Sequence, residues 1–270
     1  MRCAFAPFQG AAMPDQQTPY TSNLFLTAMA ADDLELLKPH LVRVDLPREK
    51  ELVAADEPID HVYFPEGGVV SITSELRDTA TTEIGVFGLE GMSGFHVVLG
   101  SDTSPNRTFV QVGDATTTAL AIELAPFLVT VEQSPSLQNL CLRYAQVSLT
   151  QVTYTAVSNA HHRMEARLAR WLLMCHDRID GNNIELTHRF MSMMITAERS
   201  GVTVCLHVLE GIGAIRSTRG LVTVIDRAKL EDIAGDAYGT PEAEYRRLIG
   251  PFGKSISRPI LPPSSDPPMG

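Results

Sequence analysis

Residues 185–234, ELTHRFMSMMITAERSGVTVCLHVLEGIGAIRSTRGLVTVIDRAKLEDIA, contain two short helical periods close together. The first runs from residue 186 to about residue 194 and the second from residue 199 to about residue 210. Apolar residues recur in both at the three- and four-residue spacing of an amphipathic helix. The four residues 195–198 join them. The segment therefore predicts a helix, a tight turn and a second helix, the helix-turn-helix motif.

The residues that follow these helices predict a β-hairpin. Between residues 214 and 225, runs rich in β-branched side chains flank a turn signal at Arg219-Gly220. Asp226 then suits the N-cap of a further short helix over residues 227–234. A hairpin in this place predicts the wing of a winged helix.

Upstream of the motif, no glycine or proline occurs between Pro135 and Gly181, a run long enough for one long helix followed by another. Pro135 suits the first turn of a helix, where its missing N–H would have no partner in any case. Ten residues of the run alternate in steps of four and three, the spacing of a coiled coil. They are Leu140, Tyr144, Val147, Gln151, Tyr154, Ser158, His161, Glu165, Leu168 and Leu172.

The first half of the chain alternates short apolar runs with glycine-rich turns. A short helix around residues 31–38, with Asp32 and Asp33 at its N-terminus, precedes most of them. Many short strands with turns between them predict a β-sandwich or a small barrel. The expected strands lie at 41–44, 61–64, 69–73, 82–86, 108–112 and 116–122.

Two arrangements fit the long helix. It lies against the barrel, with a neighbouring stripe that includes Cys141, Leu149 and Val152, or it also pairs with its own copy in a dimer. We favour the dimer, because a helix this long outruns one small barrel.

Composition excludes several classes of protein. The chain has 270 residues, of which 44% are hydrophobic and 20% charged, so it can bury a core. No apolar stretch reaches the roughly 18 residues that a membrane-spanning helix needs, and no secretory signal is evident. The four cysteines lie far apart without a CxxC pair, which fits a reducing cytoplasm as the expected location.

Charge is distributed unevenly along the chain. The net charge of −10 argues against a protein that coats nucleic acid. Residues 1–133 hold 7 basic and 19 acidic side chains, a balance of −12, whereas residues 134–270 hold 15 and 13, a balance of +2. The acidity thus belongs to the strand-rich half, and the helix-turn-helix half is compatible with a DNA partner.

Taken together, an acidic glycine-punctuated barrel, a long helix and a winged helix-turn-helix resemble the Crp/Fnr family of bacterial transcription regulators. Residues 185–234 resemble the family's DNA-binding domain in order, length and spacing, and EARLARWLLMCHDRI, residues 165–179, resembles the helix before it. In the first half the resemblance rests on residues 63–67, YFPEG, and 88–94, GLEGMSG. It covers about residues 23–249, most of the chain.

This resemblance implies an α+β fold with an N-terminal jelly-roll barrel of the cyclic-nucleotide-binding type, a dimerisation helix and a C-terminal winged helix-turn-helix. It also implies a homodimer that binds double-stranded DNA and has RNA polymerase as a further partner. An unidentified effector is expected, and a membrane partner is not. The expected parts are a flexible tail at 1–22, the barrel at 23–133, the long helix at 134–162, the winged helix at 163–235 and an extension at 236–270 whose end is disordered.

The second helix of the motif holds the expected DNA readers. Val202, Leu206 and Leu209 fall on its buried side, which leaves four polar side chains facing outward. By the resemblance, Arg199 matches a base-contacting arginine, which can fork to O6 and N7 of guanine. The expected readers are Arg199, Ser200, Thr203 and His207, and the expected phosphate contacts, unless merely solvated, are Arg189, Arg216 and Arg219.

Three positions depart from the family's pattern. Ser200 and Val204 stand where the best-known members have an acidic residue and a second arginine, so the base preference of those members does not transfer. Val204 either touches a thymine methyl group or packs. Thr196 replaces the usual turn glycine, so the turn is either rebuilt or strained.

The barrel lacks the family's complete nucleotide site. Members that bind cyclic nucleotides use a Gly-Glu pair for the ribose and an arginine with a small hydroxyl residue for the phosphate. Here the pair is Gly94-Phe95, and Arg107-Thr108 fits only with a shift of about one residue. Phe95 cannot accept a hydrogen bond, so cyclic AMP and cyclic GMP are not expected. Candidate contacts for another effector are Gly94, Arg107, Thr108 and Thr153, unless Arg107 simply pairs with an acid.

No catalytic or metal site is expected, and no cofactor. The chain has no P-loop, GxSxG or HExxH motif. The adjacent His161 and His162 point about 100° apart on a helix, and the four cysteines do not cluster as iron–sulfur ligands do. The cysteines are Cys3, Cys141, Cys175 and Cys205.

Two classes of function remain. The first is a homodimeric, sequence-specific DNA-binding transcription regulator. A small effector bound in the barrel would be able to modulate it. The second is an effector-binding or protein-interaction module that keeps the fold and has lost DNA binding. Thr196, Ser200, Val204 and the overall acidity favour this second class.

Overall fold

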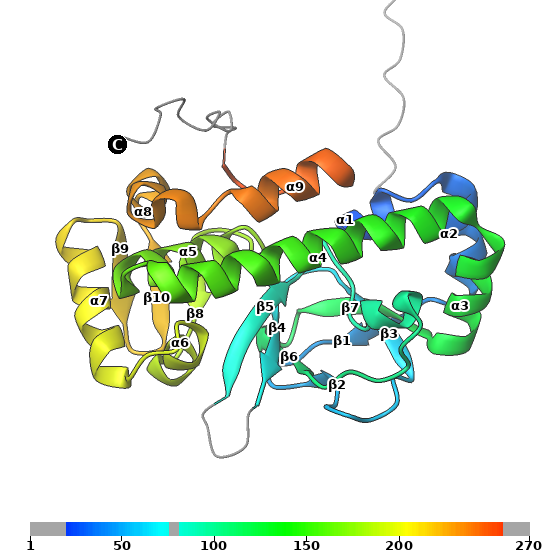
Figure 1. Ribbon diagram of the computed structural model, residues 1–270, viewed down its shortest axis with the longest axis horizontal. Coiled ribbons are helices and arrows are strands. Elements are labelled where there is room, and N and C mark those ends of the chain that lie inside the picture. The colour runs from blue at the N-terminus through cyan, green and yellow to red at the C-terminus, as the bar shows by residue number, and fades with distance from the viewer. Residues whose placement is uncertain (1–19, 76–80, 256–270) are drawn as a thin grey trace, which may run out of the picture.

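The computed structural model describes residues 20–75 and 81–255 (Figure 1). Most of the tail expected at 1–22 and the end of the expected extension lie outside these residues. A strand-rich N-terminal unit and a helical C-terminal unit lie at opposite ends of the molecule, and the long helix α4 (Pro135–His161) runs along both (Figure 1). None of the helices in the described part of the chain combines the length and the apolar character that crossing a membrane requires.

The N-terminal unit is built on two antiparallel sheets. All six predicted strands are confirmed, and β2, with three residues, is an addition. The first sheet has the order β1 (Val42–Asp45), β7 (Thr118–Glu123), β3 (His61–Pro65). The second has the order β2 (Glu51–Val53), β6 (Arg107–Val112), β4 (Val69–Ser74), β5 (Thr82–Phe87). Side chains of both sheets meet in one buried cluster that includes Leu46, Leu52, Val70, Phe87, Val110 and Ala119.

Short helices close one end of the sandwich. They are α1 (Leu24–Thr27), α2 (Ala31–Leu37) and α3 (Leu124–Gln133), with two 3₁₀ turns, η1 (Lys38–His40) and η2 (Phe95–Leu99). The helix predicted around residues 31–38 is confirmed as α2. Phe25 of α1 packs between Phe64 of β3 and Tyr144 of α4, with ring centroids 6.0 and 5.4 Å apart. This aromatic contact fixes α4 against the sandwich.

Helix α4 begins as predicted but presents its faces differently. The Ser134 side chain accepts a hydrogen bond from the backbone N–H of Leu137, and Pro135 takes the first helical position. The stripe of Leu140, Tyr144, Val147 and Gln151 is buried against its own chain. Of the neighbouring stripe, Leu149 is instead 61% exposed. The predicted 4,3 spacing is therefore an intrachain packing face, because each of its first four residues meets the sandwich or the adjoining loops.

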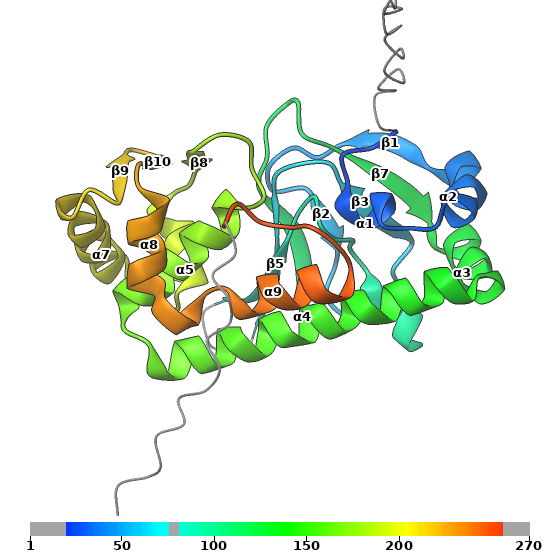
Figure 2. The same ribbon diagram turned by 90° about the horizontal axis from the view of Figure 1, so that it is seen from above.

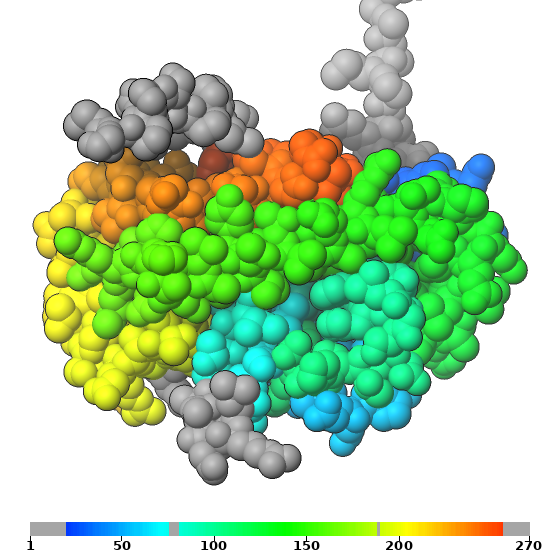
Figure 3. All heavy atoms as spheres, in the orientation of Figure 1, coloured from blue at the N-terminus to red at the C-terminus, as the bar shows by residue number. Residues whose placement is uncertain are grey.

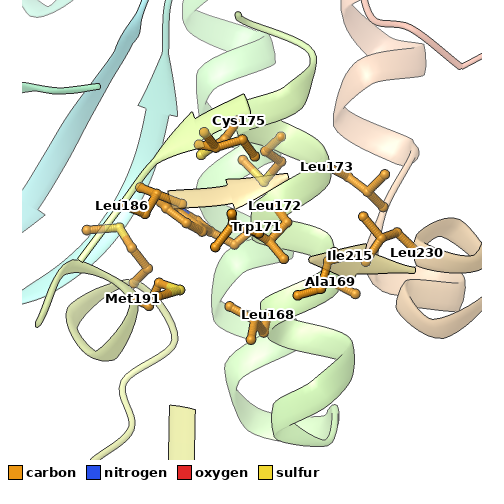
Figure 4. Close-up of a cluster of buried hydrophobic side chains, with 14 of the residues drawn as sticks. Leu168, Ala169, Trp171, Leu172, Leu173, Cys175, Leu186, Met191, Ile215 and Leu230 are labelled. Atoms are coloured by element: carbon orange, nitrogen blue, oxygen red, sulfur yellow. The ribbon is translucent and has the colours of Figure 1, made fainter. Parts of the chain in front are cut away.

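The C-terminal unit is a winged helix-turn-helix around α5 (Met164–His176). Its parts are β8 (Asn183–Glu185), α6 (His188–Met194), α7 (Arg199–Gly211), β9 (Ile215–Thr218), β10 (Leu221–Val224) and α8 (Arg227–Ala234). The three strands form an antiparallel sheet in the order β8-β10-β9. Trp171 and Leu172 of α5 pack with Leu186, Ile215 and Leu230, so α5 supplies the middle of this core (Figure 4).

A C-terminal strap, residues 236–255, was not predicted in this form. After the 3₁₀ turn η3 (Gly235–Ala237), helix α9 (Thr240–Leu248) turns back and lies beside α4 (Figure 2). Tyr245 of α9 is buried, and its hydroxyl donates a 2.8 Å hydrogen bond to the carbonyl oxygen of Glu90 in the sandwich. The strap thus ties the end of the chain to the N-terminal unit.

The two units share a continuous core. Val69, Val86 and Val112 of the second sheet belong to the same buried cluster as α5. Beneath the strap, the guanidinium of Arg178 lies against Glu90, with 2.6 Å between Nη2 and Oε1. The helix-turn-helix is therefore held on the sandwich by both apolar packing and a buried ion pair.

Candidate nucleic-acid interface and effector cavity

The turn between α6 and α7 has a strained residue at its centre. The hydroxyl of Thr187 accepts a 3.4 Å hydrogen bond from Phe190 N and caps α6. The chain then turns through Thr196, whose φ is +50°, and Ala197 N donates to the carbonyl oxygen of Ser192 over 3.0 Å. A β-branched residue rarely adopts a positive φ. Of the two alternatives for the missing glycine, the strained turn is the one found.

Helix α7 buries one side and exposes the other, as predicted. Val202, Leu206 and Leu209 are buried, together with Cys205. The expected readers Arg199, Ser200 and His207 are exposed, and Thr203 is partly buried with its hydroxyl donating to the carbonyl oxygen of Arg199 over 3.0 Å. The ring nitrogen Nδ1 of His207 lies 3.6 Å from Oε2 of Glu210.

The wing lies beside α7. Strands β9 and β10 pair with Thr218 opposite Leu221, and Gly220 in the turn has a φ of +78°. The carboxylate of Glu210 accepts a 2.5 Å hydrogen bond from Ser217 N, which joins α7 to the wing. A groove of about 750 Å³ separates helix and wing, and Thr203, His207 and Arg219 all line it.

The structure brings the exposed candidates onto one end of the molecule. Arg216 and Arg219 are exposed on the wing, and α7 lies at the outer end of the C-terminal unit, away from the sandwich (Figure 1). Arg189 is a residue of α6, and its side chain is outside what the structure describes. A helix that exposes Arg199, Ser200 and His207, with an adjoining hairpin that exposes two arginines, can enter the major groove and contact the flanking phosphates.

A cavity of about 460 Å³ lies between the sandwich and α4. Its walls come from β5, η2, α4 and the strap, and they include Ile84, Phe95, His96, Tyr144, Arg178 and Tyr245. Arg178 is already paired with Glu90. Nδ1 of His96 has no hydrogen-bond partner among the described residues, and burial lowers the pKa of this imidazole. The cavity is therefore suited to an apolar molecule with few polar groups.

Comparison with known proteins agrees with this architecture. Residues 166–233 match the Crp-like helix-turn-helix domain. The fold matches FixK2 from Bradyrhizobium japonicum with a TM-score of 0.62 at 14% identity, over 72% of this chain and 98% of FixK2. The match identifies residues 166–233 as a Crp-like helix-turn-helix domain, and the solved structures show that the chain shares their fold.

Two other solved structures have a similar fold. The c-di-GMP responsive global regulator CLP of Xanthomonas campestris has a TM-score of 0.58 and 18% identity, over 78% of this chain and 100% of CLP. A transcriptional regulator of the CRP family from Thermus thermophilus has a TM-score of 0.58 and 18% identity, over 72% of this chain and 96% of its own. These identities establish a shared fold only. No curated protein sequence matches the chain significantly.

The four candidate effector contacts predicted from the sequence do not converge on the cavity. Arg107 pairs with the carboxylate of Glu51 and lies over the Phe109 ring, 4.7 Å from its centroid. Thr108 is buried in β6, and Thr153 is exposed on the outer face of α4. Gly94 begins η2 with a φ of +65°. Phe95 and Asn106, their neighbours in sequence, do line the cavity.

The described cysteines are packing residues. Cys141, Cys175 and Cys205 are free and buried. Burial raises the pKa of the Cys141 thiol to about 12, and it also raises the pKa of Cys175 and of Cys205, so none is an activated thiolate. Cys3 lies outside the described residues. Among the residues that the structure does describe, no group of three or more His, Cys, Asp or Glu could hold a metal ion.

The sequence drew attention to Val204 alone, whereas two larger features of functional interest were not predicted. The outer face of α7 includes an apolar stripe, with Val204 59%, Val208 43% and Ile212 43% exposed. Their four-residue spacing was visible in the sequence, but amphipathicity alone assigns such residues to a core. The second feature is the strap, whose residues Glu242, Tyr245 and Phe252 line the cavity. It lies outside the matched domain, so the family pattern did not indicate it.

Proposed function

We propose that this protein acts as a homodimer that binds an inverted-repeat operator, with the expected readers of α7 placed in two successive major grooves. One observation carries the proposal: α4 has a second 4,3 stripe that is exposed, although three of its residues, Leu142, Gln146 and Leu149, also line the cavity beside the sandwich. Leu142 and Leu149 are 44% and 61% exposed, one heptad apart. The stripe continues through small and polar side chains, and its members are Leu142, Gln146, Leu149, Thr153, Ala156 and Ala160.

This stripe is suited to a two-helix seam. Residues at alternating steps of four and three lie along one line of a helix, and two such lines pack as knobs into holes. Figure 3 shows α4 as an uncovered band across one face of the molecule, between α9 and the sandwich. A two-fold axis through this seam would present two copies of α7, which matches the symmetry of an inverted repeat. We further propose that the dimer contacts RNA polymerase at the promoter and that the protein is located in the cytoplasm.

Two measurements test the homodimer. Sedimentation equilibrium should give twice the chain mass for the wild type and the single mass for Leu149→Glu, because a buried unpaired carboxylate opposes the seam. Val129→Glu on α3 is the matched control, since Val129 is 51% exposed and lies outside the stripe. A monomeric wild type, or a dimeric Leu149→Glu variant, would contradict the proposal.

Selection from random DNA tests the operator. The wild-type dimer should enrich an inverted repeat in moderate salt, because phosphate contacts weaken steeply as salt rises. Enrichment of a single half-site would count against the dimeric mode. Retention of no sequence at all, with a thermal shift on addition of small molecules, would instead support the effector-binding module that has lost DNA binding.

The cavity supports a small effector as part of this function. It lies where β5, η2 and α4 meet, so a bound molecule would touch both the sandwich and the helix that leads to the DNA-binding domain. Such a molecule can shift the population of orientations of the DNA-binding domain only if it binds one of them more tightly. A screen of uncharged apolar compounds by thermal shift, repeated on Tyr144→Ala, is the direct test.

The proposal keeps the predicted domain boundaries, which fall after residues 133, 162 and 235.

A further inference from the structure

The most exposed apolar side chain of α7 stands among the candidate DNA readers. Val204 is 59% exposed, although it belongs to a helix whose other side is fully packed. It lies one helical turn after Ser200 and one turn before His207, both of which are exposed. Of the two alternatives that the sequence left open, packing of Val204 into the core is therefore excluded.

We propose that Val204 selects thymine at one position in each half of the operator by contacting the C5 methyl group of that base. The inference rests on the proposed function, since it assigns a role within the DNA contact of α7. It goes further in naming the base that the residue prefers and the atoms that meet.

The chemistry of the major groove supports this choice of base. Adenine, guanine and cytosine present hydrogen-bond donors and acceptors there, whereas thymine adds a methyl group. Valine can neither donate nor accept a side-chain hydrogen bond, so placing it against N7, O6 or N4 would leave those groups without water or a partner. Its two methyl groups gain only from meeting another apolar group.

Position along the helix distinguishes Val204 from the other two exposed apolar residues. The N-terminal residues of a recognition helix contact base edges. Val204 is the sixth residue of α7 (Arg199–Gly211), whereas Val208 is the tenth and Ile212 lies at the C-cap. Val208 and Ile212 are also less exposed than Val204, at 43% each. Val208 is therefore a matched control of the same residue type on the same face.

The test replaces single methyl groups in the DNA. Each thymine of the operator obtained by selection is changed in turn to deoxyuridine, which removes the C5 methyl group and keeps every hydrogen-bonding atom. Binding of the wild type, Val204→Ala and Val208→Ala is measured on each duplex. At one thymine in each half-site we expect deoxyuridine to weaken wild-type binding about four-fold, the effect of one buried methyl group. Val204→Ala should lose most of this discrimination, and Val208→Ala should keep it.

The outcomes separate this inference from the function on which it rests. If no DNA sequence is enriched, the proposed function fails and the inference fails with it. If an operator is found but no thymine shows a loss that depends on Val204, the inference alone is overturned. A Val204→Ala variant that binds every duplex like the wild type but no longer alters transcription would assign Val204 to a protein contact and would also overturn it. Circular dichroism confirms folding of the variants, and alanine at this exposed site favours the helix.

Discussion

The indole N–H of Trp171 donates a 2.9 Å hydrogen bond to Oε1 of Glu83, joining helix α5 of the DNA-binding domain to strand β5 of the sandwich. Both side chains are buried, and Ser71 donates a 2.7 Å hydrogen bond to the other carboxyl oxygen. A carboxylate without a full opposite charge at this depth favours its protonated form. The junction between the sandwich and the helix-turn-helix unit therefore contains a buried carboxyl group whose pKa is raised by burial.

Because of Glu83, the free energy of unfolding should decrease as the pH rises from mildly acidic to about 8. Burial raises its pKa from 4.5 to about 8, while the hydrogen bonds from Ser71 and Trp171 and the charges of Arg170 and Arg178 oppose that rise. Between these values the folded chain holds one proton that the unfolded chain has released, so raising the pH favours unfolding. The contribution is greatest below pH 4.5 and is lost as the pH approaches 8, with a slope of up to about 1.4 kcal/mol per pH unit.

The variant Glu83→Gln isolates this effect, because glutamine does not titrate. The unfolding free energies of the wild type and of Glu83→Gln are measured in urea at several values from about pH 5 to about pH 8. As the pH rises, the difference between them should change steadily in favour of the variant. Glu132→Gln, an exposed site on α3, should leave the profile of the wild type unchanged. A difference that is constant across the range would mean that Glu83 is ionised throughout.

Removing Arg178 should destabilise the protein strongly. Both Arg178 and Glu90 are buried, and the strap covers the pair with Phe252, whose ring centroid lies 5.1 Å from the guanidinium carbon. Arg178→Met keeps much of the apolar stem but leaves a buried carboxylate without its partner, which costs about 3–5 kcal/mol. Arg247→Met is the control, because Arg247 pairs with Glu244 at the surface. Urea unfolding of the two variants should differ by several-fold in lost free energy, and equal losses would refute the argument.

The fold could be predicted from sequence where local pattern and tertiary packing agree. The helix-turn-helix, the wing and six strands follow from periodicity and turn residues, which act over short distances. The faces of α4 could not be assigned, because both stripes have coiled-coil spacing and only the distant Phe25 and Val86 decide which one is buried. The strap depends on contacts such as that of Tyr245 with Glu90, which are far apart in sequence.

Some residues of the candidate sites could likewise be placed from the sequence, and others could not. Exposure of Arg199 and His207 follows from the helical period of their own helix and was predicted. The position of Arg107 could not be predicted, because its pairing with Glu51 depends on how β6 lies beside β2. The family's spacing indicates which residues correspond to a nucleotide site, but it does not say which partners they have in this chain.

Thr196→Gly should stabilise the DNA-binding domain. Glycine adopts a positive φ without the steric penalty of a β-branched side chain, and Thr196 is exposed, so no buried contact is lost. Part of the gain is offset by the greater freedom of glycine in the unfolded chain, which leaves a net gain of about 0.5–1 kcal/mol. Thr218→Gly is the control, because Thr218 ends strand β9 and should lose stability. Calorimetry gives both shifts, and a lower Tm for Thr196→Gly would mean that the left-handed turn is not adopted in solution.

Arg199→Ala and Arg219→Ala should weaken DNA binding in different ways. Arg199 is exposed in the first turn of α7, where a guanidinium can reach a guanine edge, so its loss should cost about 1–3 kcal/mol and relax base preference at one position in each half-site. Arg219 is exposed at the tip of the wing, so we expect it to contact the phosphate backbone of the duplex. Its loss should weaken binding to all sequences alike and reduce the slope of log affinity against log salt by about 1 for each contact removed. Titration of the operator and of a scrambled duplex at several salt concentrations separates the two effects. A uniform loss for Arg199→Ala would reassign that residue from the bases to the phosphates.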